Sequence, residues 1–366
     1  MPPALAPRQR IQRLCMELHR IDRWSLPHPV QLRNLGVYEA IEGVAQQVAP
    51  MQEVLHEARQ PHAGLLRVGD CFIDILVNMV NRPVGASLAD TAHQMEGFAR
   101  TFGAYWLYRA RSGALIEPTA GLEQLLTRSD LDSALPVHLL VPPYAAQYLR
   151  YGPVARQVLA YVDPELGTIA PEGLYCFMTR EPDGSRRLCF QWHLVRDDGR
   201  DCGLQTLEAP ESNPEQPMVE WLASLPERGS HVIPPLPRQE ALGRWVMYAA
   251  KVFLYLALKD ARQLNETSFS DLATRLQRIG LKKAGKLERR MARAYDRILV
   301  GPEALPDHLS GDGRSVSPHW RRGHFRHQAH GPKQALRKLI FVAPTLIAAE
   351  ALTGPAPNPK VYVPTA

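Results

Sequence analysis

Apolar residues recur at helical spacing through the first third of the chain. Five of them return every three or four positions and predict a helix over residues 8–24: Ile11, Leu14, Cys15, Leu18 and Ile21. Similar patterns predict helices over 37–58 and 86–109, and Pro50 is expected to break or kink the first of these two. The N-terminal part is therefore predicted to be helical.

The middle of the chain changes to a period of two. Over 187–195, large apolar residues alternate with smaller or polar ones, which predicts a strand with one buried face. The turn Glu181-Pro182-Asp183-Gly184-Ser185 joins this strand to another over 173–180, because Gly takes a positive φ and Pro and Asp favour turns. A third short strand is predicted over 202–207. We interpret His193, on the second strand, as a structural histidine.

Two further helices are predicted over 239–262 and 281–300. The second has an apolar stripe and, beside it, a basic stripe made by Lys282, Lys286, Arg289, Arg293 and Arg297. This basic face could extend the anion-binding surface of the segment that follows, or it could be an ordinary solvated helix face. Residues 302–313 are predicted to be a linker, and the apolar run 336–343 a strand that ends before Pro344.

Together these elements predict an α+β fold. It has N-terminal helices, a central antiparallel β-hairpin sheet, C-terminal helices and a basic β tail. We assign residues 1–235 to an N-terminal α+β domain. Residues 236–366 are assigned to a C-terminal helical segment with a His- and Arg-rich strand tail.

Composition narrows the class of protein. The chain has 366 residues, and its 43 Lys and Arg against 37 Asp and Glu give a net charge of only +6, so the clustering of charge is more informative than its sum. No stretch approaches the roughly 18 uncharged apolar residues that a membrane span needs. The N-terminus has no signal-peptide pattern, and the five cysteines show no C-x-x-C pairing. These features predict a reduced, cytoplasmic protein without membrane contact.

The strongest cluster of charge lies between Ser317 and Lys333. This segment contains four histidines, four cationic side chains and two aromatic rings, and no acidic residue. Such a composition favours an anionic partner, and aromatic rings offer stacking surfaces for bases. We predict that the following residues bind nucleic acid: Trp320, Arg321, Arg322, His324, Phe325, Arg326, Lys333 and Arg337. The alternative is a solvated surface, or a segment that neutralises acids elsewhere in the protein.

Motifs for common catalytic sites are absent. The sequence has no G-x-x-x-x-G-K-[ST], G-x-G-x-x-G, H-E-x-x-H or G-x-S-x-G pattern, and no Cys or carboxylate completes a zinc site around the tail histidines. We therefore predict no cofactor, no metal and no conventional catalytic residue. A metal-independent ribonuclease is the alternative, with acid and base roles shared among His319, His324, His327 and His330. Whether the protein is an enzyme is left open.

The order of residues in the tail resembles that of a known family. The tail reads Pro-His-x-Arg-Arg-Gly-His-aromatic from Pro318, followed by Gly331, Gln334, Arg337 and a predicted strand that ends at Pro344. In this order it resembles the C-terminus of the second type of the type V-A anti-CRISPR inhibitors, a phage and plasmid family. Shorter patches are similar to the same family in the same order, at 101–105, 135–140, 148–149, 173–175 and 254–256.

This resemblance implies an unusual function in a bacterial host. Members of the family lower the expression of a type V CRISPR nuclease by recognising its N-terminal part as it leaves the ribosome, with degradation of the encoding mRNA. Here the body would bind the nascent peptide of the nuclease or of another target protein, with Tyr144, Tyr148 and Tyr151 as candidate contacts, and the basic tail would contact RNA or the ribosome. Core packing of these tyrosines on a helix face is the alternative. A plain protein-binding inhibitor, without RNA contact, is the alternative function.

Overall fold

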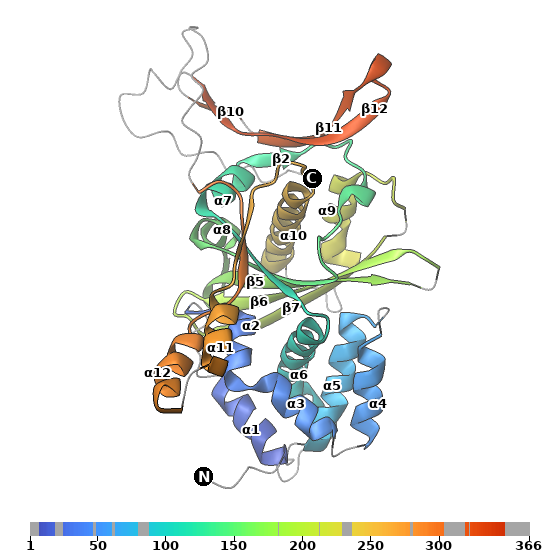
Figure 1. Cartoon of the computed structure of the whole chain (residues 1–366). Coiled ribbons are helices and arrows are strands. Elements are labelled where there is room, and N and C mark those ends of the chain that lie inside the picture. Colours follow the sequence, from blue (N-terminus) through green and yellow to red (C-terminus); the bar gives the residue numbers. More distant parts are fainter. Residues whose placement is uncertain are drawn as a thin grey trace.

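The computed structural model describes residues 7–18, 25–46, 49–60, 63–79, 88–181, 183–211, 213–228, 236–278, 281–303, 319–321 and 323–347. A large sheet lies between a layer of N-terminal helices and a layer of later helices, and a small β hairpin lies beyond the second layer (Figure 1). The α+β prediction, with helices first and strands at the C-terminal end, is therefore confirmed.

The N-terminal layer contains the helices that periodicity predicted and two further ones, the second and the fifth. Their bounds are α1 (Pro7–Leu18), α2 (His28–Leu35), α3 (Val37–Ala45), α4 (Ala49–Ala58), α5 (Leu65–Met79) and α6 (Leu88–Ala110). Residues 19–24 of the first predicted helix lie outside the described residues. As expected, Pro50 does not continue α3; it lies in the first turn of α4, where its missing N–H costs no hydrogen bond.

The sheet has eight strands within the described residues, and it mixes two pairing types. The strands are β1 (Ala114–Pro118), β3 (Ala146–Arg150), β4 (Tyr161–Asp163), β5 (Gly167–Arg180), β6 (Arg186–Arg196), β7 (Asp201–Pro210), β8 (Gln263–Glu266) and β9 (Arg297–Val300). Their order is β7-β6-β5-β3-β1-β9-β8, with β4 on β5. The predicted hairpin is confirmed as β5 and β6, which pair antiparallel. Strand β1, however, pairs parallel with both β3 and β9.

The prediction of a single buried face on the second hairpin strand is wrong. Both faces of β6 are buried, because helices cover each side of the sheet. Cys189 packs against the N-terminal helices, whereas Phe190 and Trp192 pack in a second core. That core is covered by α7 (Ala120–Thr127), α8 (Pro153–Leu159), α9 (Met218–Arg228) and α10 (Leu236–Leu256). His193 is buried and stacks on His28 at 3.6 Å, which fits its interpretation as a structural residue.

The long basic helix predicted over 281–300 is instead two elements. Helix α12 (Leu281–Met291) follows α11 (Ser268–Arg278), and the chain then enters β9, because Ile298 and its neighbours pair with β1. Strand β9 also pairs with β8, so the large sheet crosses the predicted domain boundary at residue 235. No described helix is long and apolar enough to span a membrane.

The basic tail is a β structure, as predicted. Its elements are β10 (His319–Arg321), β11 (Gly323–His330), the short helix η2 (Pro332–Gln334), β12 (Leu336–Val342) and β13 (Thr345–Ile347). We call β11, η2 and β12 the tail hairpin. It joins the body because β11 pairs parallel with β2 (Ser129–Leu131), which follows α7. Most of the predicted linker over 302–313 lies outside the described residues.

Candidate functional site

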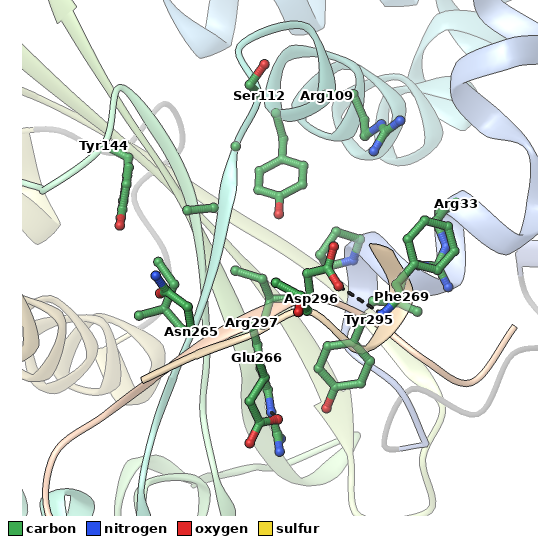
Figure 2. Close-up of a pocket in the computed structure, with 18 of the residues that line it drawn as sticks. Arg33, Arg109, Ser112, Tyr144, Asn265, Glu266, Phe269, Tyr295, Asp296 and Arg297 are labelled. Atoms are coloured by element: carbon green, nitrogen blue, oxygen red, sulfur yellow. Dashed lines mark hydrogen bonds and ion pairs between the residues drawn. The ribbon is translucent and has the colours of Figure 1, made fainter. Parts of the chain in front are cut away.

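A cleft of about 440 Å³ opens between the N-terminal helices and one end of the sheet (Figure 2). Arg33 of α2, Arg109 of α6, Phe269 of α11 and Tyr295 before β9 lie in its walls, and Tyr144 stands on the opposite side from Arg33. The space exists because α6 packs over β3 and β5, while β9 and β8 continue the sheet beyond β1. Its volume lies within the ~300–1,000 Å³ that is usual for ligand pockets.

The turn from α6 into β1 shapes one wall of the cleft. Ser112 adopts a positive φ of 51°, and Gly113 follows it. A Cβ at Gly113 would lie 2.1 Å from the ring of Tyr108, so only glycine leaves that ring its place in the wall. The position of the Tyr108 ring in the cleft wall therefore depends on a glycine at position 113.

A network of charged groups supports the floor of the cleft along β3, β1, β9 and β8, and Glu266, Tyr295 and Arg297 are its members that line the cleft. The guanidinium of Arg150 donates to Glu117 Oε1 at 3.1 Å and to Tyr295 Oη at 2.9 Å. Tyr295 Oη in turn donates to Glu117 Oε1 at 3.0 Å. Arg297 donates to Glu117 Oε2 at 2.5 Å and to Glu266 Oε2 at 2.7 Å. The carboxylates and guanidinium groups are thus mutually satisfied, which makes this floor a rigid support rather than a free charged site.

The network continues into the core at a carboxyl group. Tyr148 Oη donates to Glu172, and Arg150 Nε lies 3.7 Å from Glu172 Oε1. Burial raises the pKa of Glu172 to about 7, although the hydrogen bond from Tyr148 and the charge of Arg150 act in the opposite direction. Burial and the adjacent Glu172 also raise the pKa of Tyr148 well above its ordinary value. This pair is fully buried, so it can influence stability but cannot touch a ligand in the cleft.

Two arginines on the helical wall differ from those of the floor. Arg33 donates to the backbone carbonyls of Met291 and Ala294, and its guanidinium lies over the ring of Phe269. Arg109 is exposed and lies over the ring of Tyr38. Among the described residues, neither arginine forms an ion pair with a carboxylate.

Burial lowers the pKa of Arg33, and the positive charge of Arg109 acts in the same direction, so the two groups lie within electrostatic range. Asp296, an acid that lines this wall, acts on the pKa of Arg33 in the opposite direction, and it already accepts hydrogen bonds from the first turn of α11, at Phe269 N and Ser270 N. This wall can therefore attract a carboxylate.

Of the three tyrosines predicted to bind a peptide, the structure brings one to the cleft. The side chain of Tyr144 is 39% exposed and lines the cleft. Tyr148 and Tyr151 are fully buried, and their rings pack in the two cores on opposite faces of the sheet. A bound peptide cannot reach them. The expected alternative of packing on a helix face also needs correction, because Tyr148 lies on strand β3 and Tyr151 directly follows it.

The tail hairpin is anchored by apolar contacts and exposes its cations. Phe325 is fully buried and stacks on Phe341 at 4.6 Å, and Phe341 meets Tyr255 of α10. The sequence predicted that Phe325 stacks on a base. Phe325 is not available for this contact, because its buried ring attaches the hairpin to the body. The exposed cationic side chains of the hairpin are Arg326, Lys333, Arg337 and Lys338.

The histidines of the tail hairpin do not converge. His324 and His330 point to one face of β11, and His327 points to the other, because side chains alternate along a strand. His324 and His330 are six residues apart, which is about 20 Å along a strand. No pair among these three has the geometry for shared acid and base catalysis, and the described residues contain no cluster of three or more metal-ligating side chains.

Some predicted residues of the tail are placed only in part. Trp320 and Arg321 lie on β10, opposite Leu346 and Thr345 of β13, and His319 begins this strand. Arg322 lies outside the described residues. The prediction that Arg321, Arg322, His324, Arg326, Lys333 and Arg337 bind nucleic acid therefore stays a prediction, as does a contact by Trp320.

Sequence reasoning missed most of the cleft. Arg297 and Tyr295 were assigned to a continuous helix, whereas they lie at the start of a strand beside β1. Arg33 and Arg109 occur in ordinary amphipathic helices, and no motif marks them. The available signal was weak: the β-branched and leucine run 298–300 could have indicated a strand.

The AcrVA2-like family model, described as the anti-CRISPR type V subtype A2 family, matches residues 116–349. This range is more than half of the chain. It contains Tyr144, β8, β9, α11 and the tail hairpin, whereas Arg33 and Arg109 precede it. No curated protein matches the chain.

Proposed function

The chain belongs to the anti-CRISPR type V subtype A2 family, and on this basis we propose that it is an anti-CRISPR regulatory protein of a mobile element. It recognises a nascent N-terminal peptide of a type V CRISPR nuclease in the cleft and promotes loss of the nuclease mRNA. The tail hairpin contacts RNA or the ribosome. The family match is the single observation that carries the proposal, because it includes both the sheet side of the cleft and the tail hairpin.

The chemistry of the cleft supports a peptide ligand. The aromatic rings of Tyr144, Phe269 and Tyr295 suit apolar or aromatic side chains of a ligand. Such rings offer a large contact area, and fixing them on binding costs little conformational entropy. Arg33 and Arg109 suit a carboxylate at the other side. The ligand is therefore an extended peptide with an acidic residue a few positions from an aromatic or aliphatic one. The peptide contact is assigned to Tyr144, without Tyr148 and Tyr151.

The exposed cations of the tail hairpin support the RNA contact. Arg326, Lys333, Arg337 and Lys338 have no ion-pair partner among the described residues, and such side chains bind phosphates with little sequence preference. Lys333 lies at the hairpin tip, where it has a positive φ of 51°. Among the described residues, His324, His327 and His330 do not converge, so we assign message loss to host nucleases.

Peptide binding is the first point to test. Fluorescent peptides that tile the N-terminal part of a type V-A nuclease should include one that binds the wild type. Tyr144→Ala and Arg109→Ala should each weaken that binding about tenfold, since each removes one anchor of roughly 1.4 kcal/mol. The control is Val162→Ala, because Val162 is an exposed apolar residue that lies on β4, outside the cleft. This variant should bind as the wild type does.

The cellular outcome then separates the proposal from the alternatives. Cells carrying the nuclease gene should lose both nuclease protein and its mRNA when the wild-type chain is expressed, and lose neither with Tyr144→Ala. Inhibition of the nuclease with unchanged mRNA would indicate a plain protein-binding inhibitor. Absence of binding to every tiled peptide would reject peptide recognition by the cleft.

A further inference from the structure

A second cationic surface lies on the pair of helices beside the cleft. We call residues 268–294, which contain α11, α12 and the turn after them, the helical hairpin. Its exposed cationic side chains are Arg275, Arg278, Lys286, Arg289, Arg290 and Arg293. Asp271 and Glu288 are the exposed acids of its described residues. Within the described part of the chain, none of these six cations forms an ion pair with a carboxylate.

Four of the cations form one stripe. Lys286, Arg289, Arg290 and Arg293 follow each other at three-, one- and three-residue steps, which places them on one side of a helix. The helical hydrogen bonding continues past Met291, because Ala292 N donates to Glu288 O and Ala294 N to Arg290 O. The stripe is therefore about 10 Å long at 1.5 Å per residue. Arg289 Nε donates to Gly285 O, an uncharged partner that leaves its charge uncompensated.

The opposite side of the helical hairpin holds it to the body. Arg33 and Asn34 of α2 donate to backbone carbonyls at its C-terminal end, with Arg33 Nη2 at 2.9 Å from Ala294 O and Asn34 Nδ2 at 2.6 Å from Ala292 O. Leu272 of α11 is buried. These contacts fix the hairpin, so its cationic side chains are held on an ordered support facing solvent.

The position of this surface excludes one of two alternatives that the sequence leaves open. The basic stripe of the predicted helix could extend the surface of the basic tail, or it could be an ordinary solvated helix face. The helical hairpin and the tail hairpin instead lie at opposite ends of the molecule (Figure 1). The helical hairpin lies next to the cleft, because Phe269, Tyr295 and Asp296 line that cleft. The protein thus carries two separate cationic surfaces, and one of them borders the cleft.

We infer that the outer face of the helical hairpin binds the phosphate backbone of RNA. A row of Arg and Lys without an accompanying aromatic or aliphatic anchor suits phosphate contacts, whereas protein interfaces depend on buried apolar and aromatic anchors. The side-by-side position of the cleft and this surface means that a peptide and RNA can be held together. The inference concerns RNA affinity alone and does not depend on the proposed peptide ligand.

The test compares two triple variants of equal charge. Arg289→Ala/Arg290→Ala/Arg293→Ala removes three cations from the stripe. Arg13→Ala/Arg67→Ala/Arg180→Ala removes three exposed cations elsewhere and serves as the matched control. Affinity for a fluorescein-labelled single-stranded RNA of mixed sequence is measured by anisotropy over a range of salt concentrations. Sedimentation with purified bacterial 70S ribosomes then distinguishes ribosomal RNA from message as the source of the phosphates.

The expected result is specific to the stripe. The stripe variant should bind RNA at least about tenfold more weakly than the wild type, and the slope of log affinity against log salt should fall by about 2, or ~0.7 per lost contact. The control should retain wild-type affinity. The Lys version, Arg289→Lys/Arg290→Lys/Arg293→Lys, should restore most of the binding, which separates loss of charge from loss of fold. Weakened ribosome sedimentation would identify ribosomal RNA as a source.

Equal loss in the stripe variant and the control would overturn the inference, because it would show a general effect of net charge. Unchanged RNA and ribosome binding in a folded stripe variant would also overturn it. Binding of the tiled nuclease peptides to the stripe variant is measured in parallel. If the wild type binds none of the tiled peptides but the stripe variant still loses RNA binding, only the proposed peptide ligand is rejected. If peptides bind but RNA binding is unchanged in the stripe variant, only the present inference is rejected.

Discussion

The guanidinium of Arg33 lies 3.9 Å from the ring centroid of Phe269, and this contact joins the N-terminal helices to the helical hairpin across the cleft. The two residues are far apart in the sequence, and every strand of the large sheet except β9 lies between them. Because Arg33 also bonds to Met291 O and Ala294 O, a single side chain closes one end of the cleft and holds the element that carries the cationic stripe.

Arg33→Ala should loosen the helical hairpin. It removes two hydrogen bonds to backbone carbonyls and a cation–π contact, which together are worth roughly 2–4 kcal/mol. Hydrogen exchange should show faster exchange over residues 268–291 and little change in β5 and β6. Arg109→Ala is the control, because Arg109 does not donate to the carbonyls that Arg33 binds. Uniform exchange across both variants would contradict a holding role for Arg33.

Glu172→Gln should change how stability depends on pH. The folded pKa of about 7 lies above the ordinary 4.5, so the folded protein binds more protons than the unfolded chain between these values. The free energy of unfolding of the wild type should therefore fall by up to about 3 kcal/mol through Glu172 as pH rises from 4.5 to 7. The glutamine side chain cannot ionise, so the stability of the variant relative to the wild type should increase over that pH range.

Urea unfolding at pH 5, 6, 7 and 8 measures this difference. The gap between Glu172→Gln and wild type should widen up to about pH 7 and then stay constant. A constant gap at every pH would mean that Glu172 is ionised throughout.

Phe325→Ala should release the tail hairpin from the body. The buried ring stacks on Phe341, and loss of a buried phenylalanine costs roughly 3–5 kcal/mol. Limited proteolysis should cut within 319–347 sooner than in the wild type. Arg326→Ala, one position along β11 and exposed, should alter stability by less than about 0.5 kcal/mol. Equal protease resistance of the two variants would refute anchoring by Phe325.

Arg326→Ala/Lys333→Ala/Arg337→Ala should weaken RNA binding while leaving the fold intact, because exposed charges contribute little to stability. The salt slope should fall by about 2 for three lost phosphate contacts. Combining this variant with the stripe variant of the helical hairpin should reduce the slope further, since the two surfaces are separate. A melting temperature far below that of the wild type would show that these cations are structural.

Local patterns were sufficient for the longest helices and for the central hairpin. The spacing of Ile11, Leu14 and Leu18, and the turn at Gly184, predict α1 and the β5–β6 hairpin, because helix periodicity and turn geometry depend on neighbours in sequence. The same reasoning extended the helix over 281–300 too far. The apolar spacing of Met291, Ala294 and Ile298 fits a helix, but pairing with β1 overrides it.

The sequence by itself determined α1, α6, α10, the β5–β6 hairpin, the strand character of the basic tail and the absence of common catalytic motifs. Only the tertiary structure decided which of the singled-out side chains face solvent. Tyr148 and Phe325 are buried although each lies in a segment predicted to bind a partner, because alternation along a strand does not reveal whether a second layer covers the other face. The cleft likewise depends on Arg33, Arg109 and Tyr295, which line one space only because parallel pairing of β9 with β1 brings residues 295–300 beside the N-terminal helices.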